Sequence, residues 1–307
     1  MVTVIGHKSP DTDSVVSAIV CSSYLKKKRI NAIPAVVGKV NKETDLVLER
    51  MKEKKPLSLK KARKNDKFYL VDHNGLEQSL SGIKKENILG FIDHHQLAGT
   101  RTSQPIFCRC QPVGSTSTII FEMFKESGFR LTKKESGLLL GGIISDTLKF
   151  TSPTTTGKDK KIARLLAKEG GIKIGELAQE MFRAKSDISG MSPKEIIMGD
   201  YKEYDFLKAK IGVGVYETIS ISAINEIKEK IFKEIGQIKK ERNVDLIFFA
   251  VISILKKECF LYLDSPQELK IIQKAFKGKY IKKGIIKIAG ITSRKKQIIP
   301  PLYKILN

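Results

Sequence analysis

The sequence predicts an α/β protein, with a parallel sheet flanked by helices in its N-terminal part and a smaller α/β domain with a mixed sheet in its C-terminal part. Short apolar runs alternate with helix-period patterns through the first half, as strands alternate with helices in β-α-β units. After residue 205 the apolar runs follow one another closely, as in a partly antiparallel sheet. With 307 residues, 41% of them hydrophobic, the chain can bury two cores.

The N-terminal elements are predicted from apolar runs and their periodicity. Strands are expected at residues 2–5, 32–40, 67–74 and 88–95. Helices are expected at residues 14–28, 42–52, 115–127, 133–148 and 158–169. Because each strand is followed by a long connection, the strands are expected to run parallel.

The sequence SDISGMSP at residues 186–193 is the best linker candidate, because it gathers Ser, Gly, Asp and Pro between two helical patterns. The expected organisation is a catalytic domain at 1–187, a linker and hinge at 188–194 and a C-terminal domain at 195–307. Within that domain the expected elements are an apolar stretch at 205–218, a charged helix at 222–242 and strands at 245–255 and 259–264.

The charge balance favours a polyanionic partner. The chain has 56 Lys and Arg against 33 Asp and Glu, a formal net charge of +23. No run reaches the roughly 18 apolar residues of a membrane helix, and the first residues lack the pattern of a signal peptide. We therefore expect a cytoplasmic protein that does not bind membranes. A composition rich in Lys and Ile and without Trp is also typical of thermophile proteins, which would explain part of the charge.

The four cysteines are too few and too scattered for a disulfide framework in a chain of this length. Cys108 and Cys110 could form half of a metal site. Because no second Cys or Cys/His pair accompanies them, ordinary structural thiols in a reducing compartment are the favoured interpretation.

Every histidine of the chain ends an apolar run beside aspartates. The four are His7, His73, His94 and His95, in the sequences GHKSPDTDS, VDHN and IDHH. The carboxyl ends of parallel strands meet at one edge of a sheet, so these side chains are expected to converge. Imidazole and carboxylate ligands together suit Mn, Co, Fe or Zn better than Mg or Ca.

The potential ligands are too many for one ion. The first turn offers His7, Asp11 and Asp13, and the strand ends add one or both of Asp72 and His73 and up to three residues at 93–95. Two ions about 3.5–4 Å apart that share a carboxylate are common in enzymes that hydrolyse phosphate bonds, and Asp72 is well placed to bridge them. A single Asp-His pair would more often be a core or loop feature, but three such groups favour a site.

Two further groups add to this pattern. Asp146 ends the apolar stretch GGIISD; it could cap a turn, or complete the shell of a second ion. Near the C-terminus, Arg294, Lys295 and Lys296 form a triplet that is usually exposed to solvent but could contact the far side of a phosphate substrate. If those cations belong to the second domain, the active site lies in the cleft between domains.

The ordered set GHKSPDTDS, VDHN, IDHH, GIISDTLKFTSPT and SRKKQ resembles the family II, manganese-dependent inorganic pyrophosphatases of the DHH phosphoesterase superfamily. The resemblance runs from His7 to Lys295 and matches the short form without a regulatory nucleotide-binding insert. It implies a DHH domain that holds two Mn²⁺ or Co²⁺ ions, a C-terminal domain that closes over diphosphate, and a homodimer. It also implies hydrolysis by a hydroxide between the two ions, with an additional Mg²⁺ brought by the substrate.

The resemblance assigns roles residue by residue. One ion would be bound by His7, Asp11 and Asp72, and the other by Asp13, Asp72, His94 and Asp146. The catalytic contacts to substrate would come from His95, Lys202, Arg294 and Lys295. Asp93 would orient a histidine, and Lys296 would be structural or exposed. Gly75 and Gln96 depart from the family pattern, and neither is a ligand.

Two alternatives remain open. An exopolyphosphatase or nucleotide phosphodiesterase of the same superfamily would fit the metal motifs, but no histidine follows His95 as a GGGH-type motif would require, and polyphosphatases tend to lack the equivalent of His7. A nucleic-acid-binding protein would fit the charge. Only 7% of residues are aromatic, however, and no RRM, KH or zinc-finger pattern occurs, so no nucleic-acid partner is expected.

Overall fold

The computed structural model describes residues 1–99, 101–102, 104–219, 221–254, 256–282 and 284–307. The chain forms two compact units, unit 1 at Met1–Ala184 and unit 2 at Lys185–Asn307. Helices α6 (Ile174–Ser186) and α7 (Pro193–Met198) flank the predicted linker, and residues 187–192 between them are not helical. The exact domain limits and the hinge stay predictions.

The described residues of unit 1 form a parallel six-stranded sheet in the order β3-β2-β1-β4-β5-β6. The strands are β1 (Val2–Lys8), β2 (Ala32–Val37), β3 (Leu57–Leu59), β4 (Lys67–Val71), β5 (Ile88–Asp93) and β6 (Phe107–Cys110). The chain winds outward from β1 to β3 and then from β4 to β6 on the other side. Strands β1 and β4 therefore meet at the switch point where parallel sheets bind ligands.

The parallel sheet and its four predicted strands are confirmed, whereas β3 and β6 were not predicted. Both strands are short edge strands, and most of their side chains are at least partly exposed. Without a buried face they have no alternating apolar pattern, so their sequences do not differ from those of loops.

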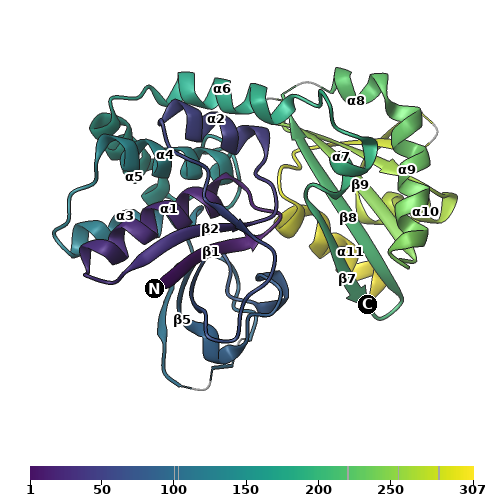
Figure 1. The fold of residues 1–307 in the computed structure, drawn as a ribbon. Coiled ribbons are helices and arrows are strands. Elements are labelled where there is room, and N and C mark those ends of the chain that lie inside the picture. Colours follow the sequence, from purple (N-terminus) through teal and green to yellow (C-terminus); the bar gives the residue numbers. More distant parts are fainter. Residues whose placement is uncertain (100, 103, 220, 255, 283) are drawn as a thin grey trace. The chain divides into compact units, whose positions relative to one another are not determined.

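Helices cover one face of this sheet, as Figure 1 shows for α1, α3, α4 and α5. The helices of unit 1 besides α6 are α1 (Thr12–Lys27), α2 (Lys42–Arg50), α3 (Thr116–Glu126), α4 (Lys133–Thr147) and α5 (Gly157–Gly170). Capping boxes, Thr132 with Glu135 and Thr156 with Asp159, begin α4 and α5. All five predicted helices are confirmed.

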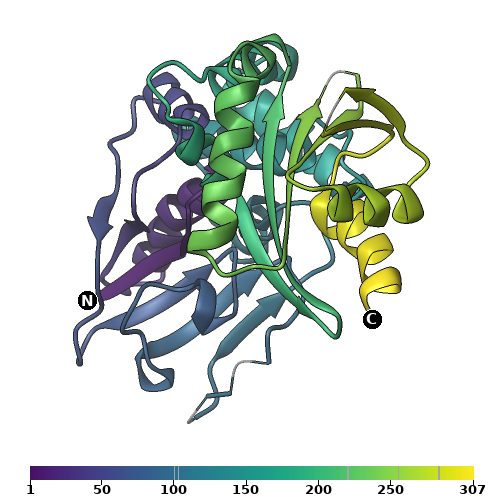
Figure 2. The same cartoon turned by 90° about the vertical axis from the view of Figure 1, so that its right-hand side faces the viewer.

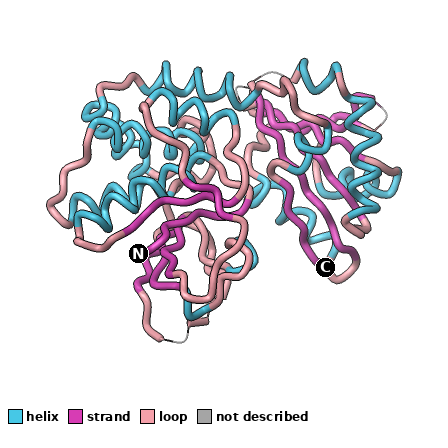
Figure 3. Tube along the Cα trace, viewed as in Figure 1, coloured by secondary structure: helices cyan, strands magenta, loops and turns pink. Residues whose placement is uncertain are grey.

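The opposite face is covered without long helices. Segments 60–66 and 72–87 precede and follow β4 in the sequence. They consist of loops and the short 3-10 turns η1 (Leu76–Gln78) and η2 (Lys85–Asn87) (Figure 3). Leu80 and Ile83 from this region pack with Phe68 and Phe91 of the strands into one buried cluster. The sheet is thus buried on both faces, which explains why its central strands read as continuous apolar runs.

The described residues of unit 2 form a mixed six-stranded sheet in the order β11-β12-β10-β9-β8-β7. Its strands are β7 (Tyr201–Phe206), β8 (Ala209–Thr218), β9 (Leu246–Ser253), β10 (Glu258–Leu263), β11 (Lys279–Lys282) and β12 (Ile285–Ala289). Strands β8 and β9 are parallel, and the other neighbours are antiparallel. The predicted mixed sheet is therefore confirmed. The last residue of the strand predicted at 245–255, Leu255, lies outside the described residues.

Two segments of unit 2 contain more elements than the sequence pattern distinguished. The stretch 205–218 is not one element but the end of β7 and the whole of β8, joined by a tight turn at Leu207 and Lys208. The helix predicted at 222–242 is interrupted at Ile227, whose backbone leaves the helical region. It divides into α8 (Ser222–Glu226) and α9 (Lys228–Glu241).

Helices pack on both faces of the second sheet. Ile231, Ile235 and Ile238 of α9 pack on one face, with α7 and α8 beside them. On the other face lie α10 (Pro266–Ala275) and α11 (Ile299–Leu306), through Ile272 and Leu302. Figure 2 shows α9 and the yellow α11 on opposite sides of these strands. In the part of the chain that the structure describes, we find no helix with the length and apolar character needed to cross a bilayer.

Candidate metal centre

The first group of potential ligands joins the end of β1 to the end of β4. His7 Nε2 lies 3.4 Å from Asp11 Oδ2 and 3.3 Å from Asp72 Oδ2. Asp11 is also the N-cap of α1, where its Oδ1 accepts the Ser14 N–H at 2.9 Å. One oxygen of Asp11 therefore holds the helix and the other faces the group.

The second group shares Asp72 with the first. It contains Asp13, Asp72, His94 and Asp146, whose ligand atoms all lie within 4.8 Å of one another. His94 Nε2 lies 3.3 Å from both Asp72 Oδ1 and Asp146 Oδ2. Asp72 thus presents Oδ2 to one group and Oδ1 to the other, which is the geometry of a bridging carboxylate.

The ring nitrogens of His7 and His94 are placed as in metal-bound histidines. The Nδ1 atoms of His7 and His94 contact the carbonyl oxygens of Lys8, at 2.7 Å, and of Val113, at 3.0 Å. A carbonyl can only accept, so each Nδ1 carries a proton, and Nε2 faces the carboxylate oxygens. Metal-bound histidines use this arrangement, since the second ring nitrogen donates to a carbonyl. Burial opposes a charge on these rings, but Asp11 and Asp72 raise the pKa of His7, and Asp146 and Asp72 raise that of His94. A proton on Nε2 and a metal ion therefore compete for the same position.

Burial makes the need for a cation stronger. Asp72 Oδ2 and His94 Nε2 are buried, and neither has a hydrogen-bond partner among the described atoms. Burial raises the pKa of Asp13 to about 7, and the charge of Asp72 adds to this shift. Burial likewise raises the pKa of Asp146, together with the neighbouring Asp13. Divalent ions would replace these protons, so the residues present fit a pair of metal ions.

Asp72, which both potential ligand groups share, has an unusual backbone. Its φ is +62°, in the left-handed region that few residues other than Gly, Asn and Asp adopt. Its N–H donates to the Ile92 carbonyl at 2.9 Å, which ties the end of β4 to β5. Such strain is frequent at functional sites, where the surrounding structure holds the residue in place.

The N-terminus of α3 donates hydrogen bonds to the buried carboxylates of Asp13 and Asp72. The sequence analysis did not predict this role. The Asp13 carboxylate accepts the N–H groups of Thr116 at 2.7 Å and Ser117 at 3.1 Å, and the Ser115 hydroxyl at 2.8 Å. Thr116 Oγ1 also donates to Asp72 Oδ1 at 2.9 Å. The only signal is the run of hydroxyl residues at 115–118, which is also typical of an ordinary helix start.

A second missed residue is Gly142, in the helix that carries Asp146. A Cβ atom at this position would lie 2.5 Å from Asp13 Oδ1 and 2.3 Å from Ser117 Oγ. Only glycine therefore allows α4 to approach the buried carboxylate and its donors so closely.

His95 differs from His94 although the two are adjacent. Its Nδ1 lies 2.9 Å from Asp93 Oδ1 and 3.8 Å from Asp72 Oδ1, and its side chain is 36% exposed. Asp93 also accepts the backbone N–H groups of both histidines, and Asn74 donates to it at 2.5 Å. The His95 ring is thus oriented by Asp93, and His95 forms a third potential ligand group with Asp72 and His94.

His73 is the one histidine that the structure does not bring into a ligand group of the described residues. Its Nδ1 contacts the Val71 carbonyl at 2.9 Å, and its Nε2 contacts the Ser79 hydroxyl at 2.7 Å. Both nitrogens are satisfied, and burial lowers the pKa of His73 to about 4. Cys108 and Cys110 lie exposed on β6, and the same ligand groups contain neither.

The three expected cations, Lys202, Arg294 and Lys295, all belong to unit 2. Arg294 begins η3, the turn Arg294–Ile298, and donates to Asp200 Oδ1 at 2.7 Å and to the Asp200 carbonyl at 2.6 Å. Burial opposes the charge of Asp200, but Arg294 and Lys202 lower the pKa of its carboxyl. Arg294 and Lys202 are therefore both near Asp200, and Lys295 is exposed on the η3 turn.

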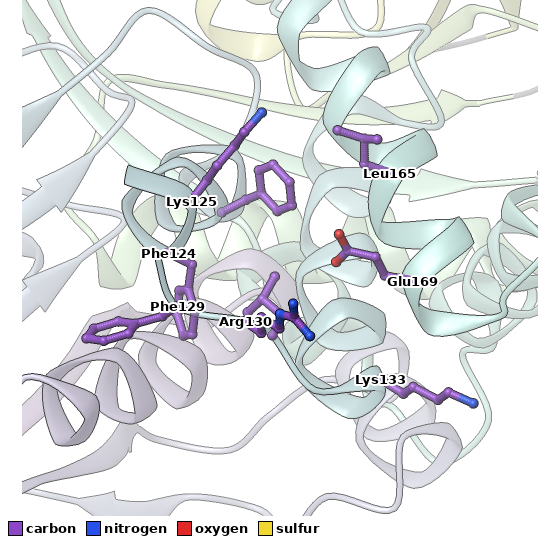
Figure 4. Close-up of a pocket in the computed structure, with 9 residues that line it drawn as sticks. Phe124, Lys125, Phe129, Arg130, Lys133, Leu165 and Glu169 are labelled. Atoms are coloured by element: carbon purple, nitrogen blue, oxygen red, sulfur yellow. The ribbon is translucent and has the colours of Figure 1, made fainter. Parts of the chain in front are cut away.

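A hollow elsewhere on unit 1 contains none of these residues. It encloses about 500 Å³ between α3, α4 and α5, and Figure 4 shows its lining side chains. Phe124 and Leu165 are among the apolar residues there, and the Lys125 and Lys133 side chains extend away from its centre. The site is therefore defined by the ligand groups rather than by a deep pocket.

Comparison with known proteins identifies the family of this chain. The model of the DHH family N-terminal domain matches residues 1–143, and that of the DHHA2 domain matches residues 179–305. A manganese-dependent inorganic pyrophosphatase of Methanothrix thermoacetophila is 38% identical over 301 residues, which cover 97% of this chain and 96% of the relative. The chain belongs to the family II, manganese-dependent inorganic pyrophosphatases.

Other members of this family are similar to this chain in sequence and in structure. A probable manganese-dependent inorganic pyrophosphatase of Clostridium acetobutylicum is 37% identical, with 98% of this chain and 97% of the relative covered. The crystal structure of a Methanococcus jannaschii family II inorganic pyrophosphatase is similar with a TM-score of 0.86 and 36% identity, over 100% of both chains. An exopolyphosphatase-related protein of Bacteroides fragilis has a TM-score of 0.50 at 15% identity, a likeness in fold alone.

Proposed function

We propose that this protein hydrolyses inorganic diphosphate to two phosphates, using two divalent ions, Mn²⁺ or Co²⁺. The observation that carries the proposal is the pair of buried groups that share Asp72, in which the Nε2 atoms of His7 and His94 face carboxylate oxygens. Relatives that are 37–38% identical over almost their whole length are named manganese-dependent inorganic pyrophosphatases, which supports both the metal and the substrate.

The six ligands fall into two sets. His7, Asp11 and Asp72 would hold one ion, and Asp13, Asp72, His94 and Asp146 would hold the other. Two ions that share a carboxylate supply an acidified water and neutralise phosphoryl oxygens. The chain itself fixes the ligands before substrate arrives, through the N-cap role of Asp11, the α3 donors on Asp13 and the carbonyl partners of both imidazoles.

Other residues would act on the phosphate oxygens. His95 has its Nδ1 on Asp93, so its Nε2 remains to donate to a phosphate when the ring is protonated. Lys202, Arg294 and Lys295 would supply positive charge, with the Arg294 guanidinium oriented by Asp200. The proposal requires that these cations of unit 2 reach a phosphate held at unit 1, with residues 188–194 as the hinge. A Mg²⁺ ion brought with the substrate would add to this charge.

Phosphate release by metal-stripped protein tests the proposal. Diphosphate, tripolyphosphate and a dinucleotide are supplied separately, and Mn²⁺, Co²⁺ or Mg²⁺ is added back. Turnover of diphosphate that requires Mn²⁺ or Co²⁺ supports the proposal. A preference for tripolyphosphate would assign the same metal site to an exopolyphosphatase, and cleavage of the dinucleotide to a phosphodiesterase.

The assembly and compartment form a separate part of the proposal. We propose a homodimer that pairs through unit 1 and works in the cytoplasm, without a nucleic-acid or membrane partner, and the family resemblance supports the pairing. Light scattering of the purified protein measures its mass in solution. A mass near 34.4 kDa instead of twice this value would contradict the dimer.

A further inference from the structure

We propose that Thr116 is a positioning residue whose hydroxyl sets the affinity of the metal pair by fixing the shared carboxylate of Asp72. This inference rests on the proposed function, because it takes Asp72 as a ligand of both ions. Thr116 is the first residue of α3 and is fully buried, as are Asp13 and Asp72.

Thr116 is unusual because it contacts two of the ligand carboxylates at once. Its backbone N–H donates to Asp13 Oδ2 at 2.7 Å, and its hydroxyl donates to Asp72 Oδ1 at 2.9 Å. Ser115 and Ser117 also donate to Asp13, so that carboxylate is held by several groups. Among the described residues, Thr116 is the one that donates a hydroxyl to Asp72.

The contact to Asp72 falls on the oxygen that faces the second ligand group. Asp72 Oδ1 lies 3.3 Å from His94 Nε2, and it has two lone pairs. The Thr116 hydroxyl occupies one of them and leaves the other directed toward the space shared with His94. A carboxylate that could rotate about its Cβ–Cγ bond would lose this alignment, and misalignment of a ligand weakens metal binding.

The Thr116 side chain is itself well fixed. A β-branched residue in a helix has few χ1 rotamers, and its methyl group is buried with the hydroxyl. At the first position of a helix the hydroxyl has no preceding turn to bond, so it can donate outward. The donor is therefore in place before an ion binds.

The same helix provides a matched control. Thr118 is also fully buried, and its hydroxyl donates to a buried aspartate, Asp159 Oδ1, at 2.6 Å. Asp159 belongs to no ligand group of the described residues and instead forms the capping box of α5 with Thr156. Removal of the Thr118 hydroxyl thus disturbs an equivalent hydrogen bond to a buried carboxylate that is not a potential ligand.

Calorimetric titration of metal-stripped, full-length protein with Mn²⁺ tests the inference without any measure of activity. Thr116→Val keeps the N–H to Asp13 and removes the hydroxyl from Asp72, so Mn²⁺ binding at one or both sites should weaken about 10- to 100-fold. Thr116→Ser keeps the hydroxyl and should bind Mn²⁺ within about 3-fold of the wild type. Thr118→Val should lower the melting temperature but leave the Mn²⁺ affinity unchanged.

Two results would overturn the inference. One is wild-type Mn²⁺ affinity in folded Thr116→Val protein, with folding checked by circular dichroism. The other is equal weakening in Thr116→Ser, which would assign the effect to the lost methyl group. If Thr116→Val does not fold, Thr116→Ala removes the same hydroxyl and is titrated in its place. A wild-type protein that binds no Mn²⁺ would instead contradict the proposed function itself.

Discussion

The functional side chains at the sheet of unit 1 are mainly acidic, whereas those of unit 2 are cationic. The topology of each sheet explains how these side chains come together. In unit 1 all strands are parallel, so the ends of β1, β4 and β5 lie on one edge and bring together His7, Asp72 and His94 from distant parts of the sequence. In unit 2 most neighbours are antiparallel, so successive strand ends alternate between edges. Its two cations near Asp200 come from one strand, β7, and from the turn η3.

The charge balance of the two regions also differs. In unit 2 the positive Arg294 already has a carboxylate partner in Asp200. In unit 1 four aspartates face three imidazoles across the ligand groups, and burial raises the pKa of Asp13 and Asp146. The comparison teaches that the acidic groups are suited to bind cations, either protons or metal ions, whereas the cationic region is suited to contact an anion.

The largest effect is expected from a substitution in the acidic groups of unit 1. Asp72→Asn removes the charge shared by both ligand groups, and the amide can still adopt a positive φ. We expect diphosphate hydrolysis to fall by about 10³-fold or more, since metal-ion stabilisation of the transition state is worth several kcal/mol. Steady-state kinetics with saturating Mn²⁺ measures this loss. Asp159→Asn is the control: it changes a buried carboxylate outside the groups and should reduce stability rather than kcat of the folded protein.

The next effect concerns the cationic side. Arg294→Gln should lower kcat/KM for diphosphate by about 10²-fold, through loss of a charge-assisted donor to phosphate, and leave Mn²⁺ affinity unchanged because Arg294 is no ligand. Lys296→Gln, in the same turn, should change kcat/KM by less than about 3-fold. Weaker Mn²⁺ binding in Arg294→Gln would contradict the separation of roles between the two units.

A third prediction tests the close packing behind the acidic site. Gly142→Ala places a Cβ against Asp13 and Ser117, and overpacking of this kind costs about 1–3 kcal/mol in unfolding free energy. Mn²⁺ affinity should fall as well, because Asp13 has to move. Gly157→Ala in α5 meets no atom within 4 Å and should be neutral or slightly stabilising. Chemical denaturation compares both variants, and equal stability of the two would contradict the packing argument.

The smallest effect is a dependence on pH. The folded-state pKa of Asp13, about 7, lies above its unfolded value, so without metal this group lowers stability as the pH rises from about 4 to about 7. Mn²⁺ binds the deprotonated carboxylate and competes with that proton. The increase in Tm caused by Mn²⁺ should therefore be larger at pH 8 than at pH 6, by about 3 °C. An equal increase at both pH values would show that the ligands carry no such protons.

The residues of the potential ligand groups could be predicted to converge because each lies near the end of a buried strand or helix, where local pattern and topology act together. The same rule does not separate His73 from His94, since VDHN and IDHH have the same local pattern. What separates them is the direction of each ring, which depends on partners such as Ser79 and Val113. Such partners are set by tertiary packing and leave no local signal.

The positioning contacts could not be predicted, for a related reason. Thr116 and Asp72 are 44 residues apart, and Arg294 and Asp200 are 94 residues apart. Short edge strands such as β3 were also missed, because only a buried face produces an alternating apolar pattern. Sequence pattern therefore identifies residues that carry chemistry, and the folded chain identifies those that hold them.

The positive φ of Asp72 limits which amino acids can ever replace it. A non-glycine residue other than Asn or Asp pays about 1–2 kcal/mol to adopt this backbone, in addition to the loss of the ligand. Of the two other acceptable residues, Gly has no ligand atom and Asn has no charge. Even Glu, which keeps the carboxylate, would strain the backbone and overreach by one methylene. The other potential ligands, His7, Asp11, Asp13, His94 and Asp146, have no positive φ, so their replacement adds no such backbone cost.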